Sequence, residues 1–377
     1  MKVVVLGCGM VGGAIACDLA RNQRLQVTAA DSNVNALNIA HAKAKDLQTV
    51  TSDLAQPSSI ENLVLGADVV VNSTPGWLGF SVFQQLISMG KNVVDIAFFS
   101  EDARTCSNSA RNSGATAVFD CGVAPGLSNM FVGEAASKLD SVKDVRIFVG
   151  GLVPQAENIY NYRAVFSPSD VLEEYVRPAR VKIDGVIQQL EALSHRETFI
   201  SHELGSLEAF VTDGLRSLLD TIDSETMIEK TLRFPGHADQ AALLRDTGLL
   251  SLSPINVDGC PVVPRNLTSE LLFPIWKFRS SDRDVTVMRV VVKGEKDGAQ
   301  RSITYDLFDR FDESSGTSSM ARTTGFTAAA VVHTMLHDSL PIKGVCAPEV
   351  LGQHEKLLTS VQGYLEERGV NWTRTEH

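Results

Sequence analysis

The sequence has no excess of positive charge. Its 34 Lys and Arg residues stand against 45 Asp and Glu residues, for a formal net charge of -11. Nucleic-acid binders carry a basic patch and anionic membranes attract basic segments, so we expect neither as a partner. No apolar run reaches the roughly twenty residues needed to cross a bilayer. A soluble protein that acts on a small molecule is the expectation.

Cysteine is scarce and without pattern. The six cysteines form no C-x-x-C pair and no grouping with the spacing of zinc ligands, so we predict no metal site. No secretory segment precedes the first expected strand, and we therefore expect reduced thiols in a cytoplasmic protein. Internal repeats and low-complexity tracts are also missing, which argues against a repetitive scaffold.

A glycine-rich turn lies near the start of the chain. The apolar run at residues 2–6 breaks at Gly7, and Gly9 and Gly12 complete a G-x-G-x-x-G pattern before a stretch with helical spacing. These glycines allow a tight turn, the approach of a pyrophosphate and close packing of helix on strand. We assign the turn to a dinucleotide, bound also by the backbone of Met10 and Val11 at the helix start.

A second apolar strand, LQVTAA, ends in Asp31, about twenty residues beyond the last glycine. A carboxylate at this position can accept hydrogen bonds from the adenosine ribose. It would repel a 2′-phosphate, and the following Ser32 and Asn33 offer no arginine to hold one. The sequence therefore predicts NAD rather than NADP as the cofactor.

Strands and helices keep alternating up to residue 122, which predicts a parallel, doubly wound sheet of the Rossmann type. Ligands of such sheets lie beyond the carboxyl ends of the strands. Asp53 follows the third strand, where it meets the adenine or caps the helix near Pro57. The later strand ends place further polar groups at the same edge: Ser73, Thr74 and Pro75 beside the nicotinamide, then Asp95, then Asp120 followed by Cys121. For Cys121 we favour simple packing of a small thiol.

Long β-rich segments with hairpin signals follow residue 123, and helical patterns return near residue 320. We predict an α/β protein with the dinucleotide-binding domain at residues 1–122 and 320–377, and an inserted mixed α+β substrate domain at residues 123–319.

Short polar stretches of the inserted domain carry groups suited to an amino acid. Arginine holds a carboxylate, a carboxylate holds an ammonium group, and histidine moves protons near neutral pH. Arg163 or Arg233 is the candidate for the α-carboxylate and Asp213 for the α-amino group, although either arginine could equally join a surface ion pair. His237 could also cap the helix that follows it. Arg322 and Thr324 lie at a helix start that is either ordinary or part of the site.

The chain resembles the saccharopine dehydrogenase-like oxidoreductases, and within them the lysine 6-dehydrogenase branch. The resemblance rests on stretches spread from residue 1 to about residue 335, among them GCGMVGGAIACDLA, AVFDCGVAPGLSN, LEAFVTDGLRSLLDT, KTLRFPGHADQ and SSMARTTGFTAAA. It implies a homodimer whose second domain carries substrate contacts and the dimer interface. It also implies NAD-linked oxidation of the side-chain amine of L-lysine to the 6-semialdehyde, which closes to 1-piperideine-6-carboxylate, with release of ammonia.

Such a reaction needs a group that removes a proton from the substrate ammonium. The candidates are Asp95, Asp120 and His237, and Asp120 could also contact the substrate. Phe98, Tyr160 and Tyr162 are candidates for an apolar wall along the lysine methylenes. Two alternatives stay open: a saccharopine or carboxynorspermidine dehydrogenase, for which Arg289 and Arg322 offer further carboxylate contacts, and a non-catalytic NAD-binding regulatory protein.

Overall fold

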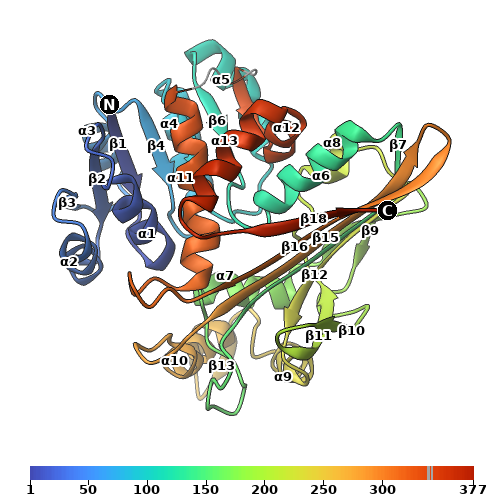
Figure 1. Ribbon diagram of the computed structural model, residues 1–377. Helices are drawn as coiled ribbons and strands as arrows, with labels where there is room; N and C mark the ends of the chain where they lie inside the picture. The colour runs from blue at the N-terminus through green and yellow to red at the C-terminus, as the bar shows by residue number, and fades with distance from the viewer. Residues whose placement is uncertain (338–339, 341–342) are drawn as a thin grey trace. The chain divides into compact units, whose positions relative to one another are not determined.

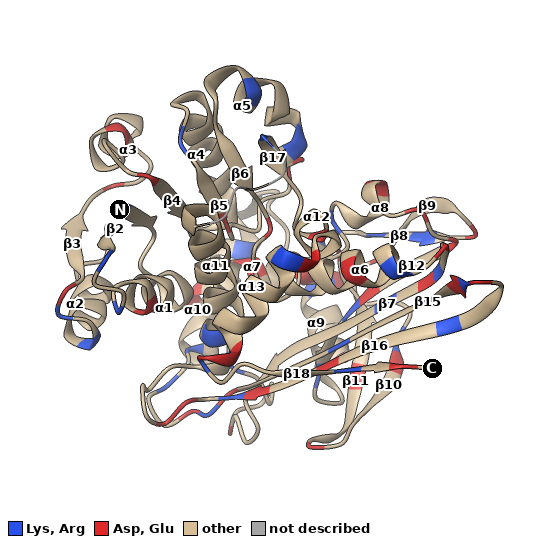
Figure 2. Ribbon diagram, turned by 45° about the horizontal axis from the view of Figure 1, so that its top comes forward, with Lys and Arg blue, Asp and Glu red and all other residues tan. Residues whose placement is uncertain are grey.

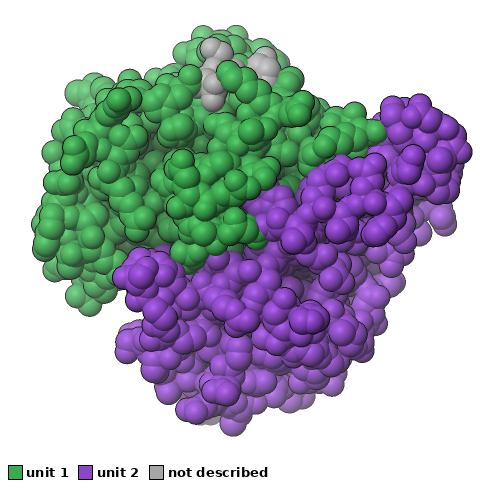
Figure 3. All heavy atoms as spheres, viewed as in Figure 1, with its two compact units in different colours: residues 1–138, 320–371 green, residues 139–319, 372–377 purple. Residues whose placement is uncertain are grey.

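A computed structural model describes residues 1–337, 340 and 343–377. The chain forms two compact units, coloured separately in Figure 3: unit 1 comprises residues 1–138 and 320–371, and unit 2 comprises residues 139–319 and 372–377. The limits differ from the predicted ones at two places. Helix α6 (Leu127–Lys138) belongs to unit 1, where it packs on α12 (Pro348–Gln353). Strand β18 (Trp372–Glu376) belongs to unit 2, where it pairs with β16 (Ala299–Arg310).

Unit 1 is built on a parallel sheet with the strand order β17-β6-β5-β4-β1-β2-β3 (Figure 1). This is the doubly wound order, extended by β17, and it confirms the predicted Rossmann sheet. The central strands are continuous β-branched runs because both faces of the sheet are covered, and Val3, Val4 and Val5 are fully buried. The strands are β1 (Lys2–Leu6), β2 (Gln26–Asp31), β3 (Gln48–Thr51), β4 (Val69–Asn72), β5 (Val93–Asp95), β6 (Thr116–Val118) and β17 (Gly344–Cys346).

Helices follow most of these strands, and their apolar faces form a core with the sheet around Phe83, Leu86 and Phe99. The helical segments are α1 (Met10–Leu19), α2 (Val34–Lys43), α3 (Pro57–Leu63), α4 (Gly76–Ser88), η1 (Ala103–Cys106), α5 (Ser107–Ser113), α11 (Ser319–His337) and α13 (Glu355–Glu366), besides α6 and α12. No helix among the described residues is long and apolar enough to cross a membrane.

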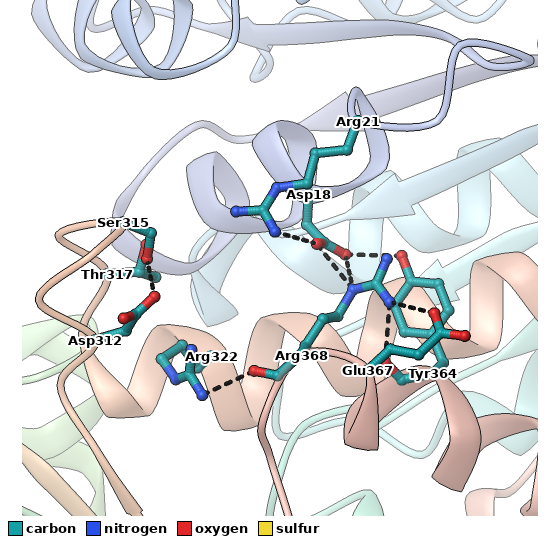
Figure 4. A network of polar contacts seen from close by, with 9 residues as sticks. All are labelled: Asp18, Arg21, Asp312, Ser315, Thr317, Arg322, Tyr364, Glu367 and Arg368. Carbon is teal, nitrogen blue, oxygen red and sulfur yellow. Dashed lines mark hydrogen bonds and ion pairs between the residues drawn. The ribbon is translucent and has the colours of Figure 1, made fainter.

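The last helix of unit 1 is joined to the first by a buried ion pair (Figure 4). The Asp18 carboxylate accepts hydrogen bonds from Arg368 Nε at 2.8 Å and from the Tyr364 hydroxyl at 2.7 Å. The Asp18 side chain is 1% exposed and that of Arg368 15%. The Arg368 guanidinium also stacks on the Tyr364 ring. A charge buried this deeply needs such partners, so α13 is held on α1.

Unit 2 is a mixed sheet with the order β10-β11-β12-β7-β15-β16-β18, to which β8 and β9 add beside β12. Strands β7 and β12 are parallel and the other pairs of this path are antiparallel. The strands are β7 (Ser141–Leu152), β8 (Ala179–Ile183), β9 (Val186–Leu190), β10 (Glu197–Ser201), β11 (Gly205–Val211), β12 (Thr226–Arg233), β15 (Val285–Lys296), β16 and β18, with a separate hairpin of β13 (Ile255–Val257) and β14 (Cys260–Val262).

Helices α7 (Pro168–Val176), α8 (Leu218–Thr221), α9 (His237–Asp246) and α10 (Pro264–Trp276) complete unit 2. The rings of Tyr162, Tyr175 and Trp276 form the centre of a core with Phe210 of the sheet. Figure 2 shows acidic and basic residues interspersed along the strands of this unit rather than gathered on one of them. The facing residues Arg289 and Asp306, for example, form a cross-strand ion pair at 2.5 Å.

Candidate active site

The glycine turn between β1 and α1 has the geometry of a phosphate cradle. A Cβ on Gly7 would lie 2.5 Å from the Ser73 carbonyl oxygen, and one on Gly12 would lie 2.2 Å from the Gly7 carbonyl oxygen. A Cβ on Gly9 would meet no atom within 4 Å, so the packing of the fold does not require glycine there. A pyrophosphate that approaches the backbone does require it, and the turn therefore fits a dinucleotide.

The start of α1 is open to an anion. Gly9 is the N-cap residue, and no side chain caps the helix. Gly9 and Met10 are exposed and Val11 is partly exposed. The first N–H groups of a helix attract a phosphate through their hydrogen bonds and the helix dipole. Asp31 ends β2 beside this turn: its Oδ2 accepts from Cys8 N–H at 2.6 Å and its Oδ1 from Asn33 N–H at 2.7 Å.

The end of β4 lies next to the same turn. The Ser73 hydroxyl donates to the Leu6 and Gly7 carbonyl oxygens at 2.9 and 2.8 Å. Thr74 is buried and its hydroxyl donates to Asn72 Oδ1 at 2.7 Å, whereas Pro75 is exposed and precedes α4. Strands β1 and β4 are neighbours at the point where the strand order reverses, which is where ligands of such sheets bind.

Asp95, at the end of β5, is fully buried and holds its neighbours in place. Its Oδ2 accepts from the Asn72 amide at 2.5 Å and its Oδ1 from Ala97 N–H at 2.9 Å. Asn72 was not predicted as a site residue, although an amide that directly follows the apolar run of β4 is the signal that could have indicated it. Phe98 directly follows Ala97 and is partly buried.

Asp120 follows β6 and has a φ of 53°, the left-handed region that L-residues other than Asn and Asp seldom adopt. Its side chain is 3% exposed. The next turn depends on glycine, because a Cβ on Gly126 would lie 2.0 Å from the Gly122 carbonyl oxygen. Cys121 is buried, and burial raises the pKa of its thiol well above the usual range, which suits a packing role.

Four further predicted residues also lie in unit 1. Asp53 is exposed beyond β3, and its Oδ1 accepts from Ala55 N–H at 3.0 Å in a turn that ends before α3. Ser32 is exposed just after Asp31. On α11, Arg322 donates to the Arg368 carbonyl oxygen at 2.9 Å. Thr324 is close to the turn after Asp120, since a Cβ on Gly122 would lie 3.4 Å from its methyl group.

Several of the predicted substrate residues come together in unit 2 around the buried guanidinium of Arg233. It donates to Glu174 Oε2 at 2.9 Å and lies 5.1 Å from the centre of the Tyr162 ring. The Tyr162 ring in turn lies 4.8 Å from the His237 ring. Arg233 Nε, the Tyr162 hydroxyl and Trp276 Nε1 are buried without a hydrogen-bond partner in the described part of the chain. Buried polar groups are normally satisfied, so these three atoms stand out as candidates for contact with a ligand or a water.

His237 is the first residue of α9 and is 3% exposed. Its Nε2 lies 2.7 Å from the Tyr175 hydroxyl. Burial and then the nearby Arg233 charge lower the pKa of His237 to about 3. The ring is therefore neutral at physiological pH, where it is a hydrogen-bond partner and a weak proton acceptor.

Arg163 and Asp213 already have partners of opposite charge. Arg163 Nε lies 3.3 Å from Asp282 Oδ2, and its Nη1 donates to the Ile275 carbonyl oxygen. The Asp213 carboxylate accepts two hydrogen bonds from the guanidinium of Arg180, at 2.9 and 3.1 Å. Tyr160 is partly buried with its ring 5.7 Å from that of Trp276.

Glu174 and Tyr175 on α7 belong to the Arg233 cluster and were not predicted. Tyr175 shares the buried face of this helix with Val171 and Leu172 at helical spacing, which the sequence does show. Its neighbour Glu174 pairs with an arginine 59 residues further along the chain. Burial raises the pKa of the Glu174 carboxyl. No group of three or more potential metal ligands occurs among residues 1–337, 340 and 343–377.

Two domain families match the chain in succession. Residues 3–118 match the saccharopine dehydrogenase NADP binding domain, and residues 122–370 match the saccharopine dehydrogenase C-terminal domain. The chain belongs to the saccharopine dehydrogenase family. Membership confirms the predicted resemblance to this family.

Curated relatives of the family are distant. The mitochondrial alpha-aminoadipic semialdehyde synthase of Rattus norvegicus is 24% identical over 279 residues, which cover 70% of this chain and 29% of that protein. The chain thus spans under a third of the length of this relative. The NADP(+)-linked, L-glutamate-forming saccharopine dehydrogenase of Saccharomyces cerevisiae is 25% identical over 267 residues, 66% of this chain and 58% of the relative. The carboxynorspermidine synthase of Vibrio cholerae is 22% identical over 336 residues, 80% of each protein.

The fold is also found in a solved member of the family. The apo structure of the L-Glu-forming saccharopine dehydrogenase from Saccharomyces cerevisiae matches with a TM-score of 0.80 at 18% identity, over 100% of this chain and 99% of that one. At this identity the likeness extends to the fold alone.

Proposed function

We propose that the protein oxidises the side-chain amine of L-lysine with NAD. One water is consumed, two electrons and a hydrogen pass to the nicotinamide as hydride, and the products are the 6-semialdehyde, an ammonium ion and a proton. The semialdehyde then closes to 1-piperideine-6-carboxylate. The resemblance supports this reaction, and so does one observation above all: a buried guanidinium, Arg233, with aromatic rings beside it and a nitrogen that has no partner among the described residues. These features suit a small amino acid.

NAD is favoured by the state of Asp31. Two backbone N–H groups each bind one of its oxygens, so the carboxylate is held in place at the end of β2. There it can accept hydrogen bonds from the ribose hydroxyl groups of NAD, whereas it would repel the 2′-phosphate of NADP. The matching domain is described as NADP binding, and the yeast relative is named for NADP. The proposal therefore separates this chain from those relatives in cofactor preference.

Deprotonation of the substrate ammonium is assigned to Asp120. Hydride leaves the carbon that bears nitrogen only when the nitrogen lone pair is free to support the iminium. Asp95 is occupied by Asn72 and Ala97 N–H, and neutral His237 is a weak base. Asp120 is buried just beyond the end of β6, at the edge of the parallel sheet where ligands of such sheets bind.

Recognition of the substrate carboxylate is assigned to Arg233 rather than Arg163. Arg163 has an acidic partner and a backbone carbonyl oxygen already. Arg233 likewise pairs with Glu174 and donates to the Leu232 carbonyl oxygen, and Nε of each arginine lacks a hydrogen-bond partner in the described chain. Arg233 is favoured by its place beside the Tyr162 ring, whose centre lies 5.1 Å from its guanidinium. Tyr162 and His237 line the same cluster, where ring faces suit the apolar methylenes of lysine.

The test is steady-state reduction of NAD by the purified protein with L-lysine, followed by mass analysis of the product. Cyclic imine and ammonia in equal amounts are expected. Asp120→Asn should lower kcat by about 10²- to 10⁴-fold, the usual contribution of a general base, while NAD affinity stays within about twofold. Reduction of NAD in the absence of any amine would contradict the proposed reaction, and an unchanged kcat in Asp120→Asn would contradict the role of Asp120.

A second candidate is oxidation of a secondary amine such as saccharopine or carboxynorspermidine, with NADP. The names of the yeast and Vibrio relatives favour it. Its extra carboxylate needs a further cation, and the two arginines first considered are engaged: Arg289 pairs with Asp306, and Arg322 donates to a backbone carbonyl oxygen. The same assay with saccharopine, carboxynorspermidine and both cofactors decides between the candidates by kcat/KM.

A further inference from the structure

A buried acid that the sequence did not single out lies on the same strand as Arg233. Glu229 is on β12 and is 3% exposed. Side chains of a strand alternate between its two faces, so Glu229, Thr231 and Arg233 point to one face of the sheet. Glu229 therefore belongs to the polar row that leads along β12 to the proposed carboxylate-binding group.

One oxygen of Glu229 is used by the loop that follows β11. Oε2 accepts from the Thr212 hydroxyl at 2.6 Å and from Gly214 N–H at 3.1 Å. The Thr212 hydroxyl also lies 2.8 Å from that of Thr231. A Cβ on Gly214 would lie 2.6 Å from the Glu229 carboxyl carbon, so the loop approaches the acid closely because residue 214 is glycine.

The negative charge of an ionised Glu229 has no cationic partner among the described residues. The hydrogen bonds from Thr212 and Gly214 both go to Oε2, and no Lys or Arg in the described part of the chain forms an ion pair with this acid. The two carboxylates that face it both have cations: Asp213 of the loop is bound by Arg180, and Glu174 of α7 by Arg233. An ionised Glu229 thus lacks the counter-charge that a buried carboxylate needs.

We propose that Glu229 binds a primary ammonium group of the substrate through Oε1. The inference rests on the proposed function, and it moves the ammonium-binding role from Asp213, which Arg180 occupies, to Glu229. An ammonium group supplies the missing positive charge and up to three donors. Arg233 and Glu229 on one strand face would then complement the carboxylate and the amine of an amino acid.

Protonation of Glu229 in the free protein gives this proposal a measurable consequence, the release of a proton on binding. Burial raises the pKa of Glu229 to about 8, with smaller contributions from the charges of Glu174 and Asp213. At pH 7 the free side chain is therefore protonated, and an ammonium group must displace that proton. Binding releases about one proton below pH 8, and affinity rises up to about tenfold per pH unit as the pH approaches 8.

The experiment is calorimetric titration of L-lysine into the full chain saturated with NADH, so that no turnover occurs. Titrations at pH 7 in two buffers of different ionisation enthalpy give the number of protons released. We expect about one for the wild type, none for Glu229→Gln, and at least a tenfold loss of affinity in that variant. Glu225→Gln, an exposed acid four residues earlier, is the matched control and should behave as the wild type.

The glutamine keeps an acceptor for Thr212 and Gly214, and circular dichroism with NADH titration verifies that the variant is folded. Lysine affinity and proton release equal to the wild type in Glu229→Gln would overturn the inference, as would failure of the wild type to bind lysine. Proton-linked lysine binding without any reduction of NAD would refute the proposed reaction and leave Glu229 as the ammonium site.

Discussion

At the scale of single residues, the Asp31 carboxylate is held by two backbone N–H groups and is the proposed partner of the cofactor ribose. We expect Asp31→Ala to raise the Kd for NADH about ten- to a hundredfold, because hydrogen bonds to a charged group contribute about 1.5–3 kcal/mol. Affinity for NADPH should fall less, since the repulsion of its 2′-phosphate is lost as well. Fluorescence titration with both reduced cofactors measures the two constants.

Asp46→Ala, at an exposed acid of the same unit, is the control and should leave both constants unchanged. Asp31→Asn separates charge from support of the turn, because an amide oxygen can still accept from a backbone N–H group. Equal losses of NADH and NADPH affinity in Asp31→Asn would contradict a role in cofactor choice.

His237 makes a prediction about stability and pH. Its pKa falls from 6.5 in the unfolded chain to about 3 in the folded one, chiefly through burial. Between these values the unfolded state binds a proton that the folded state excludes. This group therefore lowers the free energy of unfolding by about 1.4 kcal/mol for each pH unit below 6.5. Urea denaturation of the wild type and His237→Gln at pH 4.5 to 6.5 should give a steeper pH dependence for the wild type.

The exposed His202 is the control for that measurement, since its side chain is 99% exposed. His202→Gln should retain the wild-type pH dependence. If His237→Gln retains it too, the imidazole is protonated in the folded protein, and a role as proton carrier near neutral pH returns for His237.

At the scale of elements, two glycines of the turn into α1 are required for different reasons: Gly12 for packing of the fold and Gly9 for the approach of the cofactor. A Cβ on Gly12 would collide with the Gly7 carbonyl oxygen, so Gly12→Ala should lower the free energy of unfolding by about 1–3 kcal/mol, the usual cost of overpacking. A Cβ on Gly9 would meet open space, so the free energy of unfolding of Gly9→Ala should lie within about 0.5 kcal/mol of the wild-type value. Its NADH affinity should nevertheless fall at least about tenfold, a loss of about 1.4 kcal/mol.

Denaturation and NADH titration of both variants provide the comparison. A stable Gly9→Ala protein with unchanged NADH affinity would show that the pyrophosphate does not approach this turn.

Elements and side-chain partners differ in how far the sequence reveals them. The strands of unit 1 could be predicted because each is a short apolar run with its own turn signals, and their polar ends then share one edge of the sheet. The substrate groups of unit 2 depend on distant pairs. Asp213 meets Arg180 from 33 residues away, and Glu174 meets Arg233 from 59 residues away. Residue type alone identified Asp213 and Arg233 as candidates, but it did not identify Arg180 and Glu174, the partners that neutralise them.

At the scale of the whole chain, each unit is assembled from segments far apart in sequence. Unit 1 takes its last strand and helices from residues after 320, and unit 2 takes β18 from the final residues. The predicted helical return after residue 320 anticipated the first of these. The pairing of β18 with β16 had no such signal, because a short, mostly exposed strand at an edge carries little apolar periodicity.

The contact between the first and last helices of unit 1 allows a prediction of how much the C-terminal segment contributes to the free energy of unfolding. Arg368→Ala would remove the buried cation of Asp18 and leave it only the exposed Arg21 at 3.9 Å, which costs about 3–5 kcal/mol of unfolding free energy. Arg21→Ala removes an arginine that is 62% exposed and 3.9 Å from the same carboxylate, and should cost no more than about 0.5 kcal/mol. Urea denaturation of the two variants makes the comparison. If both variants lose the same small amount of unfolding free energy, α13 is held on α1 by its apolar face. The ion pair between Asp18 and Arg368 would then contribute nothing to the stability of unit 1.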